Sequence, residues 1–280
     1  MAGLLDIDWL RERLGGSRIG QRIDWQVECE STNDVAWEAL RQGAGDGLVV
    51  VSEYQLRGRG RLGRSWSMPR GAGLLFSIAL EGIEQPSHAG GGRVDDGRAS
   101  LSGGALCMLA SVAACAGIQA STGVMVSIKW PNDLLINGRK VGGILIEGRE
   151  LEPGRRVYVI GIGINCLQQR GHWEAELKSK ATSLDLESSQ PISREHVMAA
   201  IVESMNDWLS SMTNSRFEHM LEAWRLRCGD IGRPITLLHD GKTYSGTMLD
   251  VDPQAALVLQ LDRGGVRSFD VADTSVYLDT

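Results

Sequence analysis

The sequence predicts an α+β protein in which a mixed β-sheet carries helices on one side and a small β-barrel follows at the C-terminus. Short runs rich in Val, Ile and Leu outnumber the helical stretches, so helices and strands do not alternate one for one as a doubly wound sheet requires. After Cys228 four short β-runs, at 235–238, 242–250, 256–261 and 266–271, are separated by turn residues, which is typical of a small barrel. We therefore expect a large domain over residues 1–228 and a barrel over 229–280.

The elements of the large domain follow from apolar spacing and from the residues that bound each segment. Helices are expected over 6–14, over 33–41 with Ser31 or Thr32 as the cap, over 101–116 and over 194–209. Strands are expected over 47–54, 73–80, 125–129, 140–147 and 156–165. The stretch 85–100 has no periodicity, and we expect a mobile surface loop there.

The composition excludes several classes of protein. Of 280 residues, 42% are hydrophobic and 23% are charged, as in globular proteins, and no apolar run reaches the roughly 20 residues that span a bilayer. The first 14 residues carry acidic side chains where a signal peptide has basic ones, so we expect a cytoplasmic protein. Five cysteines without a C-x-x-C pair predict buried thiols and no metal site. The net charge of −6 argues against DNA binding by broad charge neutralisation.

The strongest local signal is a run of alternating arginine and glycine that follows Glu53 and ends near Trp66. Its cationic and glycine positions are Arg57, Gly58, Arg59, Gly60, Arg61, Gly63 and Arg64. The glycines match the spacing of the dinucleotide-binding fingerprint, but Pro69 and Gly71 follow where that motif needs a helix. The backbone amides and guanidiniums of such a loop can close over an anion, with Trp66 placed for stacking.

A second signal combines a lysine with paired glycines. Asn137-Gly138 between two apolar runs predicts a hairpin turn, which puts Lys140 at the start of a strand. Glycines in such a strand leave room for a ligand against the backbone, although a lysine at a hairpin end is ordinarily only solvated. Two further segments are Gly161 to Asn165, rich in glycine for a strand, and Ser31-Thr32-Asn33, which can cap a helix or bind a polar heterocycle.

Together these segments resemble the biotin protein ligases. The runs GRGRLGRSW (58–66), KWPNDL (129–134) and GRKVGGILIE (138–147) carry the resemblance, which extends from Ser31 to about Asp273. It implies a catalytic domain related to class II aminoacyl-tRNA synthetases, followed by an SH3-like barrel. It also implies a two-step reaction, in which ATP activates biotin to biotinyl-5′-AMP and the acyl group then passes to one lysine of the biotin carboxyl carrier protein of acetyl-CoA carboxylase.

The resemblance also implies roles for individual residues. Lys140 and Arg61 are the expected catalytic residues. Those expected to bind biotin are Ser31, Thr32, Asn33, Gln55, Gly58, Arg59, Gly60, Arg61, Trp66, Lys140, Gly143 and Gly163. Those expected to bind ATP or the adenylate are Arg59, Arg64, Asn132, Lys140, Asn165 and Trp173, with Mg²⁺ on the phosphates. These assignments are physically reasonable, because a carboxylate that attacks a phosphate brings two anions together and the site must neutralise their charge.

Two departures from the family pattern bear on partners. Only 30 residues precede Ser31, whereas family members that double as repressors carry about 60 residues of helix-turn-helix there, so we expect no DNA binding. We expect no membrane partner, because no apolar run is long enough to span a bilayer. Ala272-Asp273 stands where the family commonly has glycine before an acidic residue that contacts ATP. Family members often form homodimers, so we expect that this chain can form one too.

Two rival functions are a lipoate–protein ligase or octanoyltransferase of the same superfamily, and an RNA-binding module built from the Arg-Gly run and the barrel.

Overall fold

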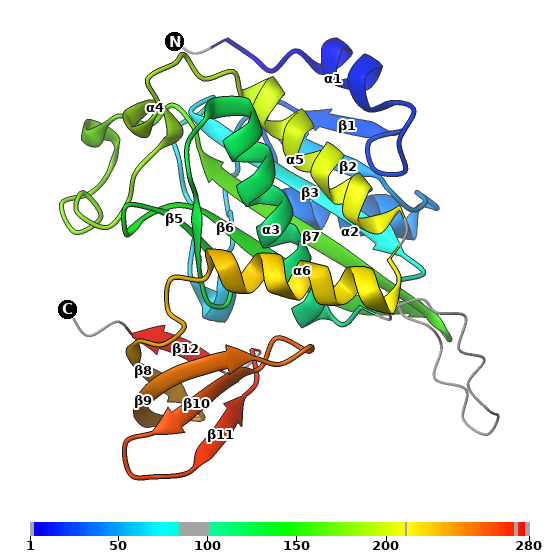
Figure 1. Cartoon of the computed structure of the whole chain (residues 1–280). Helices are drawn as coiled ribbons and strands as arrows, with labels where there is room; N and C mark the ends of the chain where they lie inside the picture. Colours follow the sequence, from blue (N-terminus) through cyan, green and yellow to red (C-terminus); the bar gives the residue numbers. More distant parts are fainter. Residues whose placement is uncertain (1–2, 84–100, 211, 272–273, 278–280) are drawn as a thin grey trace.

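A computed structural model describes residues 3–83, 101–210, 212–271 and 274–277 of the chain, and Figure 1 shows a large domain with a small sheet below it. The predicted mixed sheet is confirmed, and a second, small β-sheet is present at the C-terminus. The large sheet contains β1 (Ile23–Gln26), β2 (Val49–Ser52), β3 (Gly73–Glu81), β4 (Ser127–Lys129), β5 (Asp133–Ile136), β6 (Arg139–Glu152) and β7 (Arg155–Asn165). The predicted loop over 85–100 and the pair 272–273 lie outside the described residues.

The seven strands are ordered β1-β2-β3-β7-β6-β5-β4, and only β1 and β2 among them run parallel. Strand β7 lies in the middle, with Leu75 of β3 on one side of Gly163 and Gly143 of β6 on the other. Two glycines are therefore directly opposite each other in the sheet. Because neither has a side chain, the sheet surface is open at this point.

Helices cover both faces of the large sheet. The helices are α1 (Ile7–Leu14), α2 (Thr32–Arg41), α3 (Gly103–Thr122), α4 (Leu184–Glu187), α5 (Arg194–Leu209) and α6 (Asn214–Arg227). The long helices α3 and α5 pack together over one face, and α1 and α6 lie against them (Figure 1).

Helix α2 corrects the expectation of helices on one side only, because it lies against the opposite face. There Trp37 and Leu40 pack with Val50 of β2 and Val159 of β7. Alternation along the strands explains this arrangement: Val49 and Val51 of β2 face one side of the sheet, and Val50 faces the other. The strands are thus buried on both sides, and α2 brings its first turn to the open point of the sheet.

Helix α3 is apolar around its whole circumference and passes a length-and-composition test for a membrane span. In its most apolar window, however, 72% of the residues are buried inside the protein, under α5 and over β6. A helix that is hydrophobic on all sides belongs in the core of a large domain as readily as in a bilayer. Its place in the core accounts for its composition.

The C-terminal domain is a five-stranded antiparallel sheet ordered β11-β10-β9-β8-β12. Its strands are β8 (Pro234–His239), β9 (Lys242–Val251), β10 (Leu257–Leu261), β11 (Val266–Phe269) and β12 (Thr274–Tyr277). The sequence predicts the first four of these strands and misses β12. In the large domain, β1, α4 and α6 go unpredicted as well. The domain contacts the rest of the protein where Trp130 Nε1 donates to the carbonyl of Ala255 (2.9 Å) and Arg225 pairs with Asp250 (2.7 Å).

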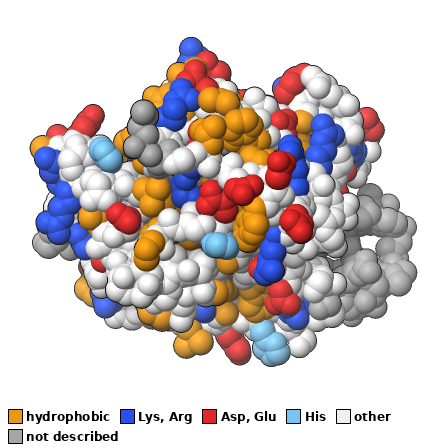
Figure 2. Space-filling view, turned by 90° about the horizontal axis from the view of Figure 1, so that it is seen from above, with side chains coloured by type: hydrophobic (Ala, Val, Ile, Leu, Met, Phe, Trp, Pro, Cys, Tyr) orange, Lys and Arg blue, Asp and Glu red, His pale blue; other side chains and the backbone are white. Residues whose placement is uncertain are grey.

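The surface does not gather charge of one sign on the face drawn in Figure 2. Among the described residues on that face, basic and acidic side chains are interspersed with hydrophobic ones. Nucleic-acid binding depends on a basic patch that spans several phosphates. This face offers no support for the RNA-binding alternative.

Candidate functional site

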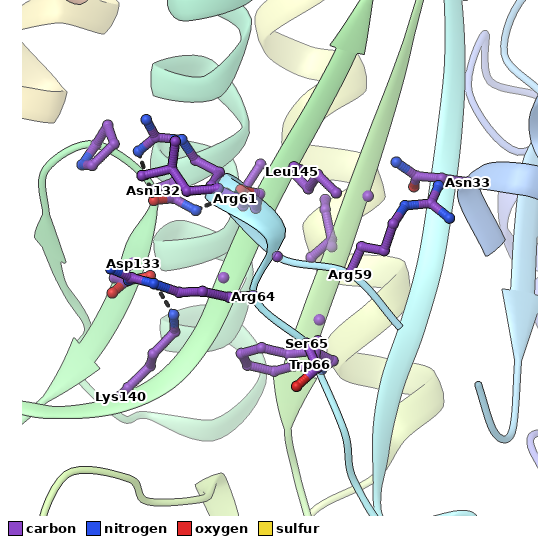
Figure 3. Close-up of a pocket in the computed structure, with 18 of the residues that line it drawn as sticks. Asn33, Arg59, Arg61, Arg64, Ser65, Trp66, Asn132, Asp133, Lys140 and Leu145 are labelled. Atoms are coloured by element: carbon purple, nitrogen blue, oxygen red, sulfur yellow. Dashed lines mark hydrogen bonds and ion pairs between the residues drawn. The ribbon is translucent and has the colours of Figure 1, made fainter. Parts of the chain in front are cut away.

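A pocket opens where the paired glycines leave the sheet bare, and Figure 3 shows its lining. Its walls come from the start of α2, the Arg-Gly loop, the turn between β4 and β5, and strands β6 and β7, with Val276 of β12 at one edge. The lining residues that the sequence predicts are Ser31, Thr32, Asn33, Gln55, Arg59, Gly60, Arg61, Arg64, Trp66, Asn132, Lys140, Gly143 and Gly163. Segments more than 100 residues apart in the chain thus meet at one cavity.

Trp66 forms one wall of this pocket by lying against the bare part of the sheet. A Cβ atom on Gly163 would come within 2.7 Å of the indole, and one on Gly143 would come within 3.6 Å of it. The indole Nε1 is buried and has no hydrogen-bond partner among the described residues. An unpaired buried donor costs about 1–3 kcal/mol, so an acceptor on a ligand would be favoured here.

At the other wall, Ser31, Thr32 and Asn33 start helix α2. Thr32 donates from both its backbone nitrogen (2.7 Å) and its hydroxyl (2.9 Å) to Gln55 Oε1. Ser77 of β3 donates to Asn33 Oδ1 at 2.6 Å, and Asn33 Nδ2 is buried without a partner in the described part of the chain. Ser31 is the N-cap residue but makes no side-chain cap bond, so its hydroxyl is not used to hold the helix.

Gln55 reaches this wall because the chain after β2 continues alongside residues 29–30. The backbone nitrogens of Leu56 and Arg57 donate to the carbonyls of Cys29 (2.9 Å) and Glu30 (2.8 Å). Two residues before Gln55, the carboxylate of Glu53 is fully buried and pairs with Arg194 at 2.7 Å. The segment that carries Gln55 is therefore fixed on both sides.

The cationic end of the pocket contains Lys140, whose ammonium pairs with the carboxylate of Asp133 (Figure 3). The same ammonium lies 5.4 Å from the centre of the Trp66 ring. The backbone of Lys140 is held by Lys180 and Thr182 at 2.7 and 2.9 Å, so the base of the side chain is anchored. Asp133 is a functional candidate that sequence reasoning missed, because its proximity depends on the pairing of β5 with β6.

Two arginines of the loop lie near this cationic end. Arg61 donates to the carbonyls of Val271 and Thr274 in the C-terminal domain, and its Nη1 lies 3.5 Å from Asn132 Oδ1. Burial is the main reason that the pKa of Arg61 is lowered. Arg64 also lines the pocket, and Figure 3 draws it beside Asp133 and Lys140.

Arg59 extends in the other direction, towards Asn33 and helix α2 (Figure 3). Its guanidinium donates to both oxygens of Asp34 at 2.6 and 2.8 Å and to Glu147 at 3.1 Å. Hydrogen bonding to Asp34 is the largest cause of a raised pKa for Arg59. In the structure this cation is already neutralised by protein carboxylates.

The loop backbone forms a small hairpin. Gly60 N donates to the carbonyl of Arg64 (2.7 Å), and Trp66 N donates to that of Gly58 (2.8 Å). Gly58 is outside the lining, but a Cβ there would meet the carbonyl of Trp66 at 2.2 Å, so this close approach requires glycine. Leu62, at the tip, has φ of 54° and is exposed.

Besides Gly58, two predicted site residues are not brought to the pocket wall. Asn165 is buried and donates to the carbonyl of Thr182 at 3.0 Å, and Trp173 lies in the segment after the short 3₁₀ turn Arg170–His172. Within the described ranges no group of three or more metal-ligating side chains occurs. Fold and pocket together define an enzyme-like cavity with a polar subsite at α2 and a cationic subsite at Lys140.

Comparisons with known proteins agree with this cavity. Residues 26–165 match the biotin/lipoate A/B protein ligase family. The chain is 32% identical over 266 residues to the biotin–[acetyl-CoA-carboxylase] ligase of Mycobacterium tuberculosis, covering 93% of this chain and 91% of that protein. It is 33% identical over 269 residues to the bifunctional ligase/repressor BirA of Bacillus spizizenii, covering 94% and 76%. The chain belongs to the biotin/lipoate A/B protein ligase family.

Solved structures show the same fold at lower sequence identity. The biotin protein ligase from Aquifex aeolicus in complex with biotin and ATP superposes with a TM-score of 0.73 at 22% identity, covering 92% of this chain and all of that one. The biotin protein ligase from Leishmania major in complex with biotinyl-5-AMP gives a TM-score of 0.56 at 20% identity, covering 89% and 98%. The similarity in each case includes the C-terminal domain, since most of both chains is covered.

Proposed function

We propose that this chain is a biotin protein ligase, which uses ATP to form biotinyl-5′-AMP and transfers the biotinyl group to a lysine of a biotin carboxyl carrier protein. The observation that carries the proposal is the arrangement of one pocket with two unlike ends. An unpaired donor of Asn33 and the hydroxyl of Ser31 lie at α2, the Lys140 ammonium lies at the other end, and Trp66, whose ring centre is 5.4 Å from that ammonium, forms the wall between them. Biotin, in which a neutral polar ring is joined to a carboxylate tail, is complementary to both ends of the pocket.

At the polar end, this chain's residues bind and orient the ureido ring. Asn33 Nδ2 supplies a donor for its carbonyl oxygen, and the hydroxyl of Ser31, which makes no cap bond, can accept a hydrogen bond from one of its N–H groups. Thr32 and Ser77 hold Gln55 and Asn33 in place. Trp66 and the bare glycines of the sheet enclose the apolar part of the ligand.

In the first step, a carboxylate oxygen of biotin attacks the α-phosphate of ATP and pyrophosphate leaves. Lys140 is anchored by its backbone before ATP arrives, so its charge acts on the developing oxyanions without reorganisation. Arg64 and Arg61 add positive charge from the loop. Asp133, which also lines the pocket, holds the ammonium by an ion pair.

In the second step, the neutral ε-amine of the carrier lysine attacks the acyl carbon of biotinyl-5′-AMP and AMP leaves. The Arg-Gly hairpin and Trp66 keep water away from the mixed anhydride until the carrier arrives. Asp133, in the pocket, is a carboxylate that can accept the proton lost by the attacking amine.

Mg²⁺ fits this site as a companion of ATP. Magnesium is commonly held by substrate phosphates with one or two carboxylates, and Asp133 is the carboxylate within the lining. Bound there with ATP, the ion would neutralise phosphate charge.

The test of this function compares biotin with lipoate, the substrate of the rival branch of the family. The full chain is incubated with ATP, Mg²⁺ and either acid, and the acyl-adenylate is detected by mass spectrometry. We expect biotinyl-5′-AMP and no lipoyl-5′-AMP. An adenylate formed from lipoate alone would assign the chain to the rival function.

A further inference from the structure

Arg59 and Arg57 lie two residues apart on the same loop, but their surroundings differ. Arg57 forms one exposed pair with Glu30 at 3.0 Å, and 83% of its side chain is accessible. Arg59 makes three hydrogen bonds to two carboxylates that belong to different elements, Asp34 on α2 and Glu147 on β6. Its guanidinium therefore joins the loop, the helix and the sheet.

The carboxylate of Glu147 is itself held by the protein. Trp37 of α2 donates its indole N–H to Glu147 Oε2 at 2.7 Å. Arg149 lies 3.5 Å from the same oxygen and stacks on the Trp37 ring at 4.5 Å from its centre. These contacts fix the carboxylate of Glu147 in place. The hydrogen bond from Arg59 to this carboxylate therefore holds the loop against the sheet.

The position of Arg59 in the hairpin links these contacts to the pocket. Arg59 pairs with Ser65 across the hairpin, and Ser65 is followed by Trp66, which lies on Gly163. Asp34 directly follows Asn33, which faces the pocket. Figure 3 shows Arg59 directed away from Lys140 and Asp133, so it is not aimed at the charged end where phosphates would bind.

We propose that Arg59 is a positioning residue that clamps the Arg-Gly hairpin to α2 and β6 through Asp34 and Glu147, and that it does not serve as an anion ligand. The proposal rests on the proposed function. The clamp holds Trp66 over the sheet and so sets how tightly biotin and its adenylate are retained. The charge that acts on the phosphates comes from Lys140, Arg61 and Arg64.

The two roles for Arg59 predict opposite effects when its partners are removed. If Arg59 is a clamp, Asp34→Asn with Glu147→Gln will behave like Arg59→Ala, because either change unfastens the hairpin. If Arg59 is an anion ligand, removing the two carboxylates will free its charge and improve ATP binding. Arg59→Lys keeps the charge but loses the bidentate contact with Asp34. If Arg59 is a clamp, this variant should therefore behave between wild type and Arg59→Ala.

A first measurement uses no ligand. Although the side chain of Leu62 is exposed, chymotrypsin needs several residues of extended backbone, so cleavage after Leu62 or Trp66 becomes faster when the hairpin hydrogen bonds open locally. We expect the Asp34→Asn/Glu147→Gln and Arg59→Ala variants to be cleaved about tenfold faster than wild type. Arg57→Ala, which removes an arginine from the same loop, is the matched control and should be cleaved within about twofold of wild type.

A second measurement uses the reaction. For both clamp variants we expect the KM for biotin to rise and biotinyl-5′-AMP to be released about three- to tenfold faster, with the KM for ATP within about twofold of wild type. Unchanged cleavage rates would overturn the clamp, and so would a lower KM for ATP in the carboxylate double variant. Absence of biotinyl-5′-AMP from wild-type protein would instead reject the proposed function, while the cleavage rates would still decide on the clamp.

Discussion

Lys140 is the side chain on which the proposed first step depends most. Its backbone is fixed by two hydrogen bonds on strand β6, and its ammonium is turned into the pocket by Asp133. Removing one preorganised group of this kind costs about 3–4 kcal/mol in the transition state, or roughly 10²–10³ in rate. We expect that loss for Lys140→Ala in single-turnover formation of biotinyl-5′-AMP at saturating ATP.

The control for this prediction is Lys140→Arg, which keeps the charge but replaces a compact ammonium with a planar fork. We expect only partial recovery of the rate, because the fork cannot occupy the same place between two oxyanions. A rate for Lys140→Ala within about threefold of wild type would show that this lysine is only solvated beside a hairpin turn.

Gly163 offers a test of the Trp66 wall. A methyl group there would come within 2.7 Å of the indole, so Gly163→Ala must displace Trp66 from the sheet. We expect the KM for biotin to rise by about tenfold or more, since the enclosing wall and one donor are lost. Gly45→Ala meets no atom within 4 Å and should leave the KM unchanged. An unchanged KM in Gly163→Ala would mean that Trp66 does not bind the ligand.

Arg61 has contacts with both the loop and the C-terminal domain, so its loss should loosen the closed pocket. We expect Arg61→Gly to form biotinyl-5′-AMP but to release it early, because two carbonyls of the C-terminal domain lose their donor. A free acyl-adenylate acylates amines at random, so unrelated proteins mixed with the variant should become biotinylated. Arg57→Gly is the control, and strict selectivity for the carrier in Arg61→Gly would contradict this account.

At the scale of single elements, the buried pair between Glu53 and Arg194 connects strand β2 to the first turn of α5. Both side chains are almost completely buried, and Arg194 also donates to the carbonyls of Gly73 and Gly3. Breaking such a pair leaves an uncompensated buried charge, which costs about 3–5 kcal/mol. We expect a loss of that size in the free energy of unfolding of Glu53→Gln, measured with urea.

The matched control is Glu203→Gln, which removes the pair between Arg13 and Glu203 on the surface. Those side chains are 56% and 39% accessible, so the expected loss is at most about 1 kcal/mol. Equal losses in the two variants would show that the buried pair adds nothing beyond a surface ion pair.

Elements with strong local signals could be predicted from the sequence. Helix α5 begins and ends as predicted, with Ser193 accepting from His196 N as its cap. Strand β12 could not be predicted, because four residues have no clear periodicity and become a strand only by pairing with β8. The side of the sheet on which α2 lies could not be predicted either, since that depends on which apolar face of β2 it covers.

The candidate site was predictable at the level of motifs and not at the level of contacts. Thirteen predicted residues line one pocket, because unusual glycines and arginines mark the loop and the sheet in the sequence itself. The residues of the loop alone do not predict which way each arginine side chain points. Arg59 turns to Asp34 and Arg61 to the C-terminal domain because of partners that lie far away in the chain.

For the whole molecule, the thiols predict how stability depends on pH. Burial raises the pKa of Cys107, Cys115 and Cys166 to about 12 from an ordinary value of 9.0. The folded state keeps these thiols neutral, whereas the unfolded chain ionises them once the pH exceeds 9. The free energy of unfolding should therefore be unaffected by these groups below pH 9 and should fall between pH 9 and about 12.

Urea titrations from pH 7 to 11 measure this effect, and Cys107→Ser with Cys115→Ser and Cys166→Ser provides the comparison. The wild type should lose more stability above pH 9 than the triple variant does. Identical slopes in the two proteins would contradict the assignment of these cysteines as buried neutral thiols.

The measurement that tests the central claim most directly follows the acyl group to its acceptor. The full chain is mixed with ATP, Mg²⁺, a purified biotin carboxyl carrier domain, and equal amounts of biotin and lipoate, and the intact mass of the carrier is recorded. We expect one biotinyl group on one lysine, no lipoyl group, and no modification when ATP is omitted. A carrier that stays unmodified, or that gains lipoate in preference to biotin, would contradict the account.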